Sequence, residues 1–332
     1  MGEILISVVV CTHNRAEMLR QALESLALQS LDRHKYEIVV VDNRSSDRTQ
    51  LVVRDFETKE PSCHLTLMYE PTLGLGHARN AGWRGAKGTF VAFMDDDARA
   101  DAHWLEWALE SFQDVKPSPV AVGGPIFPYY VSQKPSWFKD EYELRSWGKS
   151  PRWLNAGETF SGSNMIIRRD ILEALGGFDV RVGMKGKRIS VGEETALFQN
   201  LWESGRASGA LQYSPRLVVY HAVGGSKLRA FYHVRRAFVA GQVWYLQNGP
   251  KVFRERARFI RQTIRAIRSL GASAFKGFRT YHDYHNWVVE SLAPIALEVG
   301  RLLGGFGAFV PVWQGRGSVP GKESSVSCHQ AE

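Results

Sequence analysis

Cysteine is scarce in this sequence. The 332 residues include three cysteines, Cys11, Cys63 and Cys328, and no two of them form a C-x-x-C pair. This number and spacing exclude a disulfide framework and a cysteine-ligated zinc site. The first residues also lack the basic segment and small-residue cleavage site of a secretory signal. We therefore expect a protein of the reducing cytoplasm.

Long apolar runs are absent as well. The most apolar segment, residues 292–313, is interrupted by Pro294, Glu298, Arg301 and Pro311. A membrane-spanning helix needs about 20 consecutive apolar residues. We expect this segment to contact a membrane without crossing it.

Two common phosphate-binding motifs are missing. The chain has no G-x-x-x-x-G-K-[ST] loop, and its glycine-rich segment 74–82 does not match G-x-G-x-x-G. The absence of both motifs argues against a P-loop kinase and against an NAD-dependent enzyme. The same segment does combine glycines, a helix start and Arg79, which suits the binding of an anion.

The first half of the chain alternates β-branched runs with helical patterns, the order typical of a parallel α/β sheet. Residues 117–158 are rich in Pro, Trp and Tyr without clean periodicity, and we expect a loop-rich insertion there. Asn14 is expected to cap the first helix. The predicted strands are residues 4–11, 36–41, 65–69, 89–94 and 217–221, and the predicted helices include 77–86, 169–175 and 193–204.

Polar residues follow several of these strands. Ligands bind at the carboxyl edge of open α/β sheets, so Thr12, Asp42 and Asp95 to Asp97 should meet in one cleft. Three adjacent carboxylates repel one another unless a cation lies between them, and Mg²⁺ or Mn²⁺ takes oxygen ligands. A solvated acidic turn is the alternative. For Asp42 we expect contact with a nucleobase or ribose, with a simple Asx turn as the alternative.

The set of segments resembles family 2 glycosyltransferases of the GT-A fold, over roughly residues 7–221. The resemblance implies an α/β protein with a GT-A Rossmann-like mixed sheet flanked by helices. It also implies inverting transfer of a sugar from a nucleoside-diphosphate sugar, UDP by analogy, to a hydroxyl group. The matching segments are V-V-V-C-T-H-N-R at 8–15, A-R-N at 78–80, D-D-D at 95–97, L-G-G-F-D at 175–179 and G-E-E-T at 192–195.

The resemblance assigns roles to individual residues. Glu194 is the expected general base, although Glu193 is a second candidate because the family usually has Asp at position 194. Expected metal ligands are Asp97, Asp95 and His221, with a core histidine as the alternative for His221. From its glycines and basic residues, the loop 181–188 is a candidate for closing over the diphosphate, with a solvated basic loop as the alternative. Donor contacts are expected from Thr12, Asn14, Arg15, Asp42, Arg79, Asn80, Asp95 and Asp96.

The end of the chain is strongly basic. Residues 227–279 carry thirteen Lys or Arg and one acid, Glu255. We expect a helix lying on an anionic membrane surface, with a helix packed on the core as the alternative. Because no nucleic-acid motif is found, we expect no nucleic acid as a partner. The apolar residues Phe253, Ala257, Ile260, Ile264 and Ile267 form one helical stripe, and Arg254, Arg258, Arg261, Arg265 and Arg268 repeat it one position later.

These observations predict three parts: a catalytic domain at 1–225, a helical membrane-associating extension at 226–315 and a disordered tail at 316–332. The resemblance implies surface or extracellular polysaccharide synthesis at the inner face of the cell membrane, with a glycan or polyprenyl-diphosphate-linked acceptor. Trp137 and Trp153 are candidate acceptor contacts. The rivals are a metal-dependent sugar nucleotidyltransferase, which leaves the Gly192-Glu193-Glu194 segment unexplained, and a non-enzymatic membrane or glycan-binding module.

Overall fold

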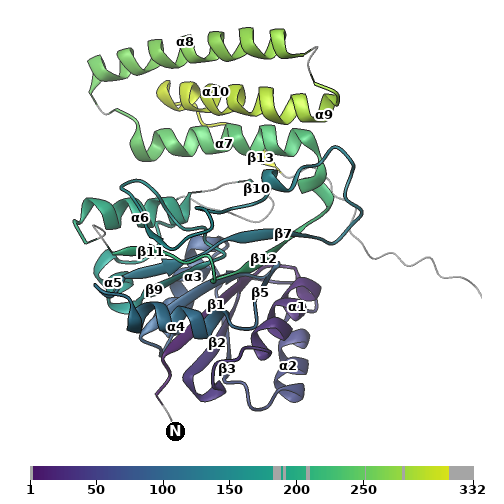
Figure 1. Cartoon of the computed structure of the whole chain (residues 1–332), viewed down its shortest axis with the longest axis vertical. Helices are drawn as coiled ribbons and strands as arrows, with labels where there is room; N and C mark the ends of the chain where they lie inside the picture. Colours follow the sequence, from purple (N-terminus) through teal and green to yellow (C-terminus); the bar gives the residue numbers. More distant parts are fainter. Residues whose placement is uncertain are drawn as a thin grey trace, which may run out of the picture.

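The computed structural model describes residues 3–181, 188–189, 192–206, 210–250, 252–278 and 281–313. An α/β body forms the lower part of the view in Figure 1, and a layer of C-terminal helices covers one side of it. The predicted disordered tail at 316–332 and most of the predicted diphosphate loop lie outside the described residues.

The body is built on an eight-stranded mixed sheet with the order β3-β2-β1-β4-β9-β6-β11-β8. Strands β1 to β4 are parallel, whereas β9 runs antiparallel to both β4 and β6. The expected GT-A mixed sheet flanked by helices is confirmed. The strands are β1 (Ile6–Thr12), β2 (Tyr36–Asp42), β3 (Leu65–Tyr69), β4 (Phe90–Asp95), β6 (Ala121–Gly123), β8 (Arg152–Trp153), β9 (Met165–Arg168) and β11 (Leu211–Tyr213).

The central strands are apolar on both faces because helices cover both. Val8 and Val10 join the core on one face of the sheet, and Val9 joins the core on the other. This is why the strands appear in the sequence as continuous apolar runs. One face packs against α1 (Ala16–Ala27), α2 (Thr49–Lys59) and α4 (Trp104–Asp114), and the other against α3 (Leu75–Gly85), α5 (Arg169–Leu175) and α6 (Glu193–Glu203).

A second, three-stranded sheet lies beside the first, in the order β5-β12-β7. It consists of β5 (Ala98–Ala100), β7 (Ile126–Tyr130) and β12 (Val219–Val223). The strand expected at 217–221 therefore belongs to this sheet and not to the main one. Its pairing places His221 opposite Ala98, next to the three acids that end β4.

Most of the segment 117–158 lies outside helices and strands, as expected, but it also holds the short strands β6, β7 and β8. Each of these pairs with a strand distant in sequence that local periodicity does not reveal. Asn14 does not cap α1, whose N-cap is Arg15. Asn14 instead adopts a positive φ of 54° and accepts a hydrogen bond from the Ser46 backbone N–H at 2.7 Å.

The C-terminal layer contains α7 (Ala230–Asn248), α8 (Phe253–Gly277), α9 (Tyr284–Trp287), the π-helix η4 (Val288–Leu292) and α10 (Ala293–Gly305). Glycines let α7 and α10 pack closely. A Cβ atom at Gly241 would lie 2.0 Å from the Leu297 carbonyl oxygen, and one at Gly300 would lie 2.1 Å from that of Phe238. Smaller elements are the 3-10 turns η1 (Arg33–Lys35), η2 (Asp140–Tyr142) and η3 (Gly225–Leu228) and the strand pair β10 (Arg188–Ile189) and β13 (Val312–Trp313).

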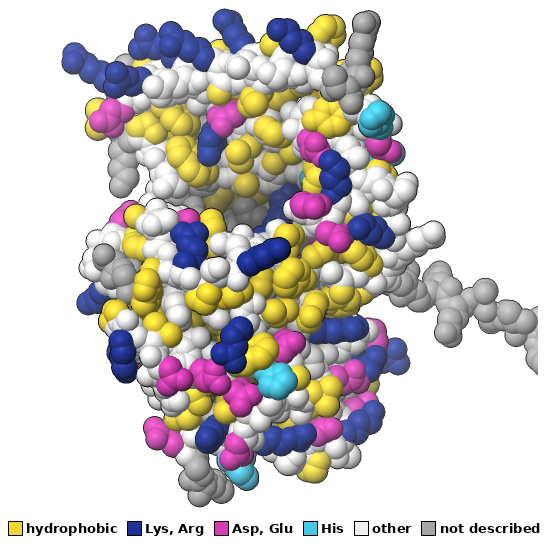
Figure 2. All heavy atoms as spheres, viewed as in Figure 1, with side chains coloured by type: hydrophobic (Ala, Val, Ile, Leu, Met, Phe, Trp, Pro, Cys, Tyr) yellow, Lys and Arg dark blue, Asp and Glu magenta, His cyan; other side chains and the backbone are white. Residues whose placement is uncertain are grey.

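Helix α8 is the outermost element of this layer (Figure 1). It is longer than the predicted segment 253–267. In its apolar stripe Ala257, Ile260, Ile264 and Ile267 are half-buried, and α8 packs against α10, with Thr263 buried and Phe259 stacked on Trp244 of α7 at 5.7 Å. The arginine stripe faces outward, and Lys and Arg side chains gather along that edge in Figure 2. The packing on α10 agrees with the alternative of a helix packed on the rest of the protein with its basic face outward, and contact of α8 with a membrane stays a prediction. Among the described residues, no helix has the length and apolarity to span a bilayer.

The close packing of α7 on α10 predicts opposite effects for two glycine-to-alanine changes. Gly300→Ala places a Cβ against the Phe238 carbonyl and should lower the free energy of unfolding by about 1 to 3 kcal/mol. Gly271→Ala, in α8 with open space around it, should raise the free energy of unfolding by about 0.5 to 1 kcal/mol. Urea unfolding measures both, and equal midpoints for the two variants would contradict the packing.

Candidate active site

A cavity of about 280 Å³ lies where the carboxyl ends of β1 and β4 face α6, β12 and α7. Figure 2 shows the molecule hollowed between the α/β body and the helical layer. Most of the predicted site residues line this cavity. They come from the ends of β1 and β4, as expected, and also from the second half of the chain. The predicted residues that line it are Thr12, Arg15, Arg79, Asp95, Asp96, Asp97, Glu193, Glu194 and His221.

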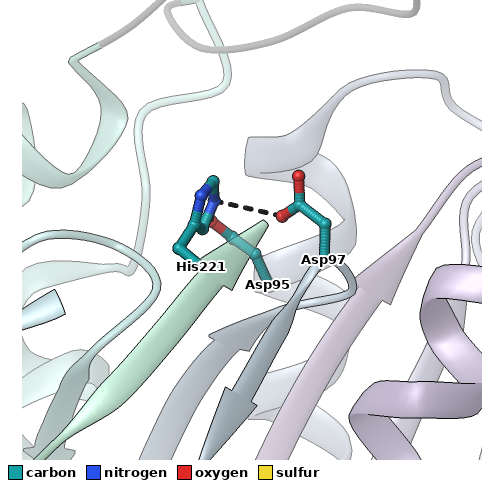
Figure 3. A group of neighbouring side chains, drawn as sticks. All are labelled: Asp95, Asp97 and His221. Carbon is teal, nitrogen blue, oxygen red and sulfur yellow. Dashed lines mark ion pairs between the residues drawn. The ribbon is translucent and has the colours of Figure 1, made fainter. Parts of the chain in front are cut away.

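The three predicted metal ligands form one cluster. Candidate ligand atoms of Asp95, Asp97 and His221 lie within 4.8 Å of one another. His221 Nε2 is 3.1 Å from Asp97 Oδ1 and 3.9 Å from Asp95 Oδ2, and Figure 3 shows the three side chains pointing toward a common point. Two carboxylates and an imidazole suit Mn²⁺ and, with water and phosphate oxygens, Mg²⁺.

Two cationic side chains face the same cluster. Lys227 Nζ is 3.2 Å from Asp97 Oδ2, and Arg15 Nη1 is 3.3 Å from that atom. Burial opposes ionisation of Asp97, but His221, Lys227 and Arg15 together hold the pKa of Asp97 well below its usual value. Asp97 is therefore an ionised carboxylate, the form that binds a metal.

Asp96 faces away from this cluster. Its carboxylate accepts hydrogen bonds from Thr12 Oγ1 at 2.8 Å and from Arg15 Nη1 at 3.0 Å. Burial raises the pKa of Asp96 to about 6, against the opposing effect of Arg15. Asp96 therefore ties the end of β1 to the acid triplet, and only its two neighbours are in the metal cluster.

Arg79 connects the two acidic groups of the cavity. Its Nη2 is 3.0 Å from Asp95 Oδ1, and its Nη1 is 3.2 Å from Glu193 Oε1. The guanidinium is almost fully buried, and a Cβ atom at Gly162 would lie 2.4 Å from it, so only glycine leaves room there. A single side chain thus joins the strand that ends in the acids to the helix that carries the glutamates.

The two glutamates at the start of α6 differ in environment. Glu193 is buried, and its Oε2 finds no hydrogen-bond partner among the described residues. Burial, followed by the charge of Glu194, raises the pKa of Glu193 to about 8. Glu194 is partly exposed and also lines the cavity. Glu194 is therefore the one whose carboxylate is open to the cavity, while Glu193 is held by Arg79.

Three predicted donor contacts are placed outside the cavity lining. The Asp42 carboxylate accepts hydrogen bonds from the Ser45 N–H at 2.8 Å and from Gln50 Nε2 at 3.1 Å, and the next residue, Asn43, lines the cavity instead. Asn14 is exposed and bonded to Ser46. The donor roles of Asp42 and Asn14 stay predictions.

The third is Asn80. Its side chain donates to the Phe178 carbonyl at 2.8 Å and accepts from the Phe178 N–H at 2.8 Å and from Trp83 Nε1 at 2.9 Å. These bonds fasten the L-G-G-F-D turn to α3. The A-R-N and L-G-G-F-D segments thus support each other, and a donor contact from Asn80 stays a prediction.

The two predicted acceptor tryptophans are far apart. Trp137 lines a second cavity, of about 440 Å³, and its ring stacks on His285 at 4.9 Å. Trp153 lies on the edge strand β8 and is not among the residues that line either cavity. The structure therefore brings only Trp137 near the active-site region.

Sequence reasoning missed several residues of the first cavity. Lys227 was counted as the start of the basic tail, although its position six residues after His221 places it beside Asp97. No local pattern marks the others, because they come from the irregular insertion and from the inner face of α7. These residues are Glu143, Arg145, Tyr232 and Arg236.

Comparison with known proteins identifies the class of protein that has this fold and this cavity. The sequence model for glycosyl transferase family 2 matches residues 7–176, and the chain belongs to that family. This confirms the resemblance seen in the sequence.

Two curated relatives are similar over large parts of the chain. A glucosyl-dolichyl phosphate glucuronosyltransferase of Haloferax volcanii is 29% identical over 60% of this chain and 63% of its own length, slightly less than two thirds. The succinoglycan biosynthesis protein ExoM of Rhizobium meliloti is 28% identical over 77% of this chain and 78% of its own length.

Solved structures share the fold at lower identity. The mannosyltransferase PcManGT from Pyrobaculum calidifontis, in complex with GDP-Man and Mn²⁺, aligns over 91% of this chain and 88% of its own, with a TM-score of 0.61 and 22% identity. Residues 1–349 of S. aureus TarS, in complex with UDP, align over 92% of this chain and 91% of that chain, with a TM-score of 0.51 and 16% identity.

The buried Glu193 predicts a pH-dependent stability. Below pH 4.5 its carboxyl is protonated in both the folded and unfolded states. Between pH 4.5 and about 8 only the unfolded chain releases this proton, so the contribution of Glu193 to the free energy of unfolding falls as the pH rises.

Glu193→Gln removes that titration. Its free energy of unfolding should therefore rise relative to the wild type from pH 4.5 to pH 8, as measured by urea unfolding in EDTA. Glu203→Gln, at the exposed end of the same helix, is the matched control. A constant difference between Glu193→Gln and the wild type across this range would contradict the buried, protonated state.

Proposed function

We propose that the protein transfers a sugar, with inversion, from a nucleoside-diphosphate sugar to a hydroxyl of a glycan or lipid-linked acceptor. The observation that carries the proposal is the shared cavity, in which Asp95 and Glu193 are held on opposite sides of Arg79. Sugar transfer needs a cation at the departing diphosphate and a base at the acceptor hydroxyl. Membership of family 2 argues against the nucleotidyltransferase and binding-module alternatives.

The metal side of the cavity suits a diphosphate. Asp95, Asp97 and His221 would hold Mg²⁺ or Mn²⁺, which stabilises the charge of the departing group. Arg15 and Lys227 add positive charge beside the same carboxylate. The Mn²⁺ complex of PcManGT is consistent with this choice of metal.

Donor contacts are proposed on this side from the predicted set. Thr12, Arg15, Arg79 and the first two aspartates already line the cavity, whereas Asn14, Asp42 and Asn80 reach a ligand only if their present hydrogen bonds rearrange. UDP is kept as the proposed nucleotide by analogy. GDP is the alternative, since solved structures of similar fold contain one or the other.

Glu194 is proposed as the general base. It opens α6, faces the cavity and is not tied to Arg79. It would take the proton of the acceptor hydroxyl as that oxygen attacks the anomeric carbon and the diphosphate leaves. One displacement of this kind inverts the configuration. Glu193 would position Arg79 and the start of α6.

The acceptor is proposed to be a growing surface or extracellular polysaccharide, or its lipid-linked precursor. One relative acts on glucosyl-dolichyl phosphate by its name, and another is named for succinoglycan biosynthesis. Such acceptors lie at the inner face of the cell membrane, which agrees with a cytoplasmic, peripherally bound enzyme. Trp137, in the second cavity, is a proposed acceptor contact, and Trp153 remains one by prediction only.

The outer face of α8 is proposed to bind an anionic membrane. Continuing the steps of four and three beyond the arginines leads to Ala272 and then Phe275, which is 85% exposed. Arginines attract anionic headgroups, while an exposed phenylalanine enters the interface. The contact therefore uses the exposed face that borders the apolar stripe. The exposed residues of this face are Arg254, Arg258, Arg261, Arg265, Arg268, Ala272 and Phe275.

The separate roles of the acids predict different losses. Asp97→Ala should abolish Mn²⁺-dependent turnover of the nucleotide sugar, because the metal loses a ligand. Glu194→Gln should lower turnover by about 10²- to 10⁴-fold while leaving nucleotide binding intact. The measurements are release of nucleoside diphosphate from UDP- and GDP-sugars, and calorimetric binding of UDP and GDP with Mn²⁺.

Glu203→Gln, at the exposed end of α6, is the control for these changes. A fully active Glu194→Gln beside an inactive Glu193→Gln would transfer the base role to Glu193. Wild-type turnover by Asp97→Ala in EDTA would remove the metal from the mechanism.

The α8 face predicts release from anionic vesicles. Replacing Arg254, Arg258, Arg261 and Arg265 with Gln should weaken binding to phosphatidylserine-containing vesicles by about 1 kcal/mol per arginine. The charge-matched control replaces Arg48, Arg54, Arg84 and Arg206, four exposed arginines of the α/β body, with Gln. Co-sedimentation measures both, and equal binding by the two quadruple variants would exclude α8 as the membrane-binding face.

A further inference from the structure

Two arginines share one carboxylate in the active-site cavity. Arg236, on α7, places Nη1 at 3.1 Å from Glu143 Oε1, and Arg145 places Nη2 at 3.8 Å from Glu143 Oε2. The Glu143 side chain is 4% exposed, whereas those of Arg145 and Arg236 are 33% and 31% exposed. Both guanidinium groups therefore have a face open to the cavity.

Positive charge exceeds negative charge among Arg145, Arg236 and Glu143. Burial and then the charge of Arg236 lower the pKa of Arg145 to about 10, in spite of Glu143. His233 adds no positive charge, since burial lowers the pKa of its imidazole. Within ion-pair distance, the two guanidinium groups share the single carboxylate of Glu143. An anion bound between them would relieve their repulsion, and guanidinium groups bind oxyanions through paired hydrogen bonds.

This pair is distinct from the cations at the metal cluster. The charges acting on Asp97 come from His221, Lys227 and Arg15. Those acting on Arg145 come from Arg236, Glu143, Tyr232 and Glu194. Glu194, the proposed base, is thus among the charges that act on Arg145 and lines the same cavity, and Lys227 acts on both Asp97 and Glu143.

The second cavity shares one lining residue with the active-site cavity. Tyr232 lines both cavities, and the second is also lined by Trp137, Phe231, Arg229 and Tyr284. Phe231 and Tyr284 are each more than half exposed. A ligand anchored at the arginine pair therefore has an aromatic surface beside it for a sugar ring or an apolar chain.

We propose that Arg145 and Arg236 bind an anionic oxygen group, phosphate or carboxylate, on the acceptor and so place its hydroxyl at Glu194. The proposal rests on the proposed sugar transfer and names the class of acceptor. Glu143 holds the two arginines in position, and Arg145 and Arg236 contact the acceptor. A neutral glycan leaves their surplus charge unneutralised.

The test uses the full chain with UDP or GDP and Mn²⁺ at saturation, so that the donor side is filled. Calorimetric titration compares glucose 6-phosphate, glucuronate and glucose. We expect the anionic sugars to bind at least about tenfold more tightly than glucose, since a hydrogen bond to a charged group contributes at least that factor. Equal binding of glucose would overturn the proposal.

Arg145→Gln and Arg236→Gln should each weaken binding of the anionic sugars by about tenfold. Arg236→Lys should lose less, because the charge remains. Arg216→Gln, which removes an exposed arginine paired with Glu110 at 3.0 Å, is the control and should bind like the wild type. If the variants lose nucleotide affinity as strongly as sugar affinity, the arginines belong to the donor site and the proposal is wrong.

Calorimetric titration with farnesyl phosphate distinguishes a lipid-linked acceptor from a soluble or polymeric one. Tighter binding than glucose 6-phosphate supports a lipid-linked acceptor that uses the aromatic cavity, and weaker binding supports a soluble or polymeric one. The proposed function fails on a different measurement, namely a wild type without metal-dependent turnover of any nucleotide sugar. If such a protein still bound anionic sugars through Arg145 and Arg236, the anion site would stand and only the proposed sugar transfer would fail.

Discussion

The buried ion pairs of Arg79 are the constraint on which the rest of the site depends. This guanidinium is buried with Asp95 at 3.0 Å as its charged partner, and its other nitrogen lies 3.2 Å from the Glu193 carboxyl group, whose pKa burial raises to about 8. Removing one member of such a set leaves the others unpaired in a poorly solvated place. The ion pairs also join segments that are 114 residues apart in the chain. The distance between metal side and base is therefore fixed by one side chain.

The surroundings of Arg79 explain why several motifs occur together. Gly162 leaves space for the guanidinium, and Phe178 lies under it at 5.5 Å. Asn80 holds the Phe178 backbone on both sides with its amide. The segments that look like separate sequence motifs are thus parts of one packing arrangement, in which each fixes the position of another.

Much of the fold could be predicted from the sequence because its central strands are buried on both faces. Val8 to Val10 and Ile38 to Val41 form continuous apolar runs that local patterns reveal. The metal cluster was also predictable, since Asp95 and Asp97 end a strand and the family resemblance supplies His221. The short strands within the insertion at 117–158 could not be predicted, because they form only by pairing with distant ones.

The same limit applies to the acceptor side and to α8. Arg145 and Arg236 carry no local pattern, and only the fold brings them to Glu143. For α8, the apolar stripe is visible in the sequence, but its partner α10 is not, so the sequence left open whether a membrane or the rest of the protein covers this stripe. An amphipathic helix specifies which face is buried without specifying what buries it.

The contact between α7 and the start of α6 links the C-terminal layer to the residues of the cavity. Gln247 donates to the Gly192 carbonyl at 2.8 Å, and a Cβ atom at Gly192 would lie 2.5 Å from Val243, so the C-terminal layer holds the residue that precedes both glutamates. The family match ends at residue 176, before all of these residues. The part of the chain within the family match thus supplies Arg79, Asp95 and Asp97, and the rest supplies His221, Lys227 and both glutamates, so the two parts build the cavity together. Any change at Val243 or Gln247 in the C-terminal layer therefore reaches the start of α6 directly, without altering the sheet.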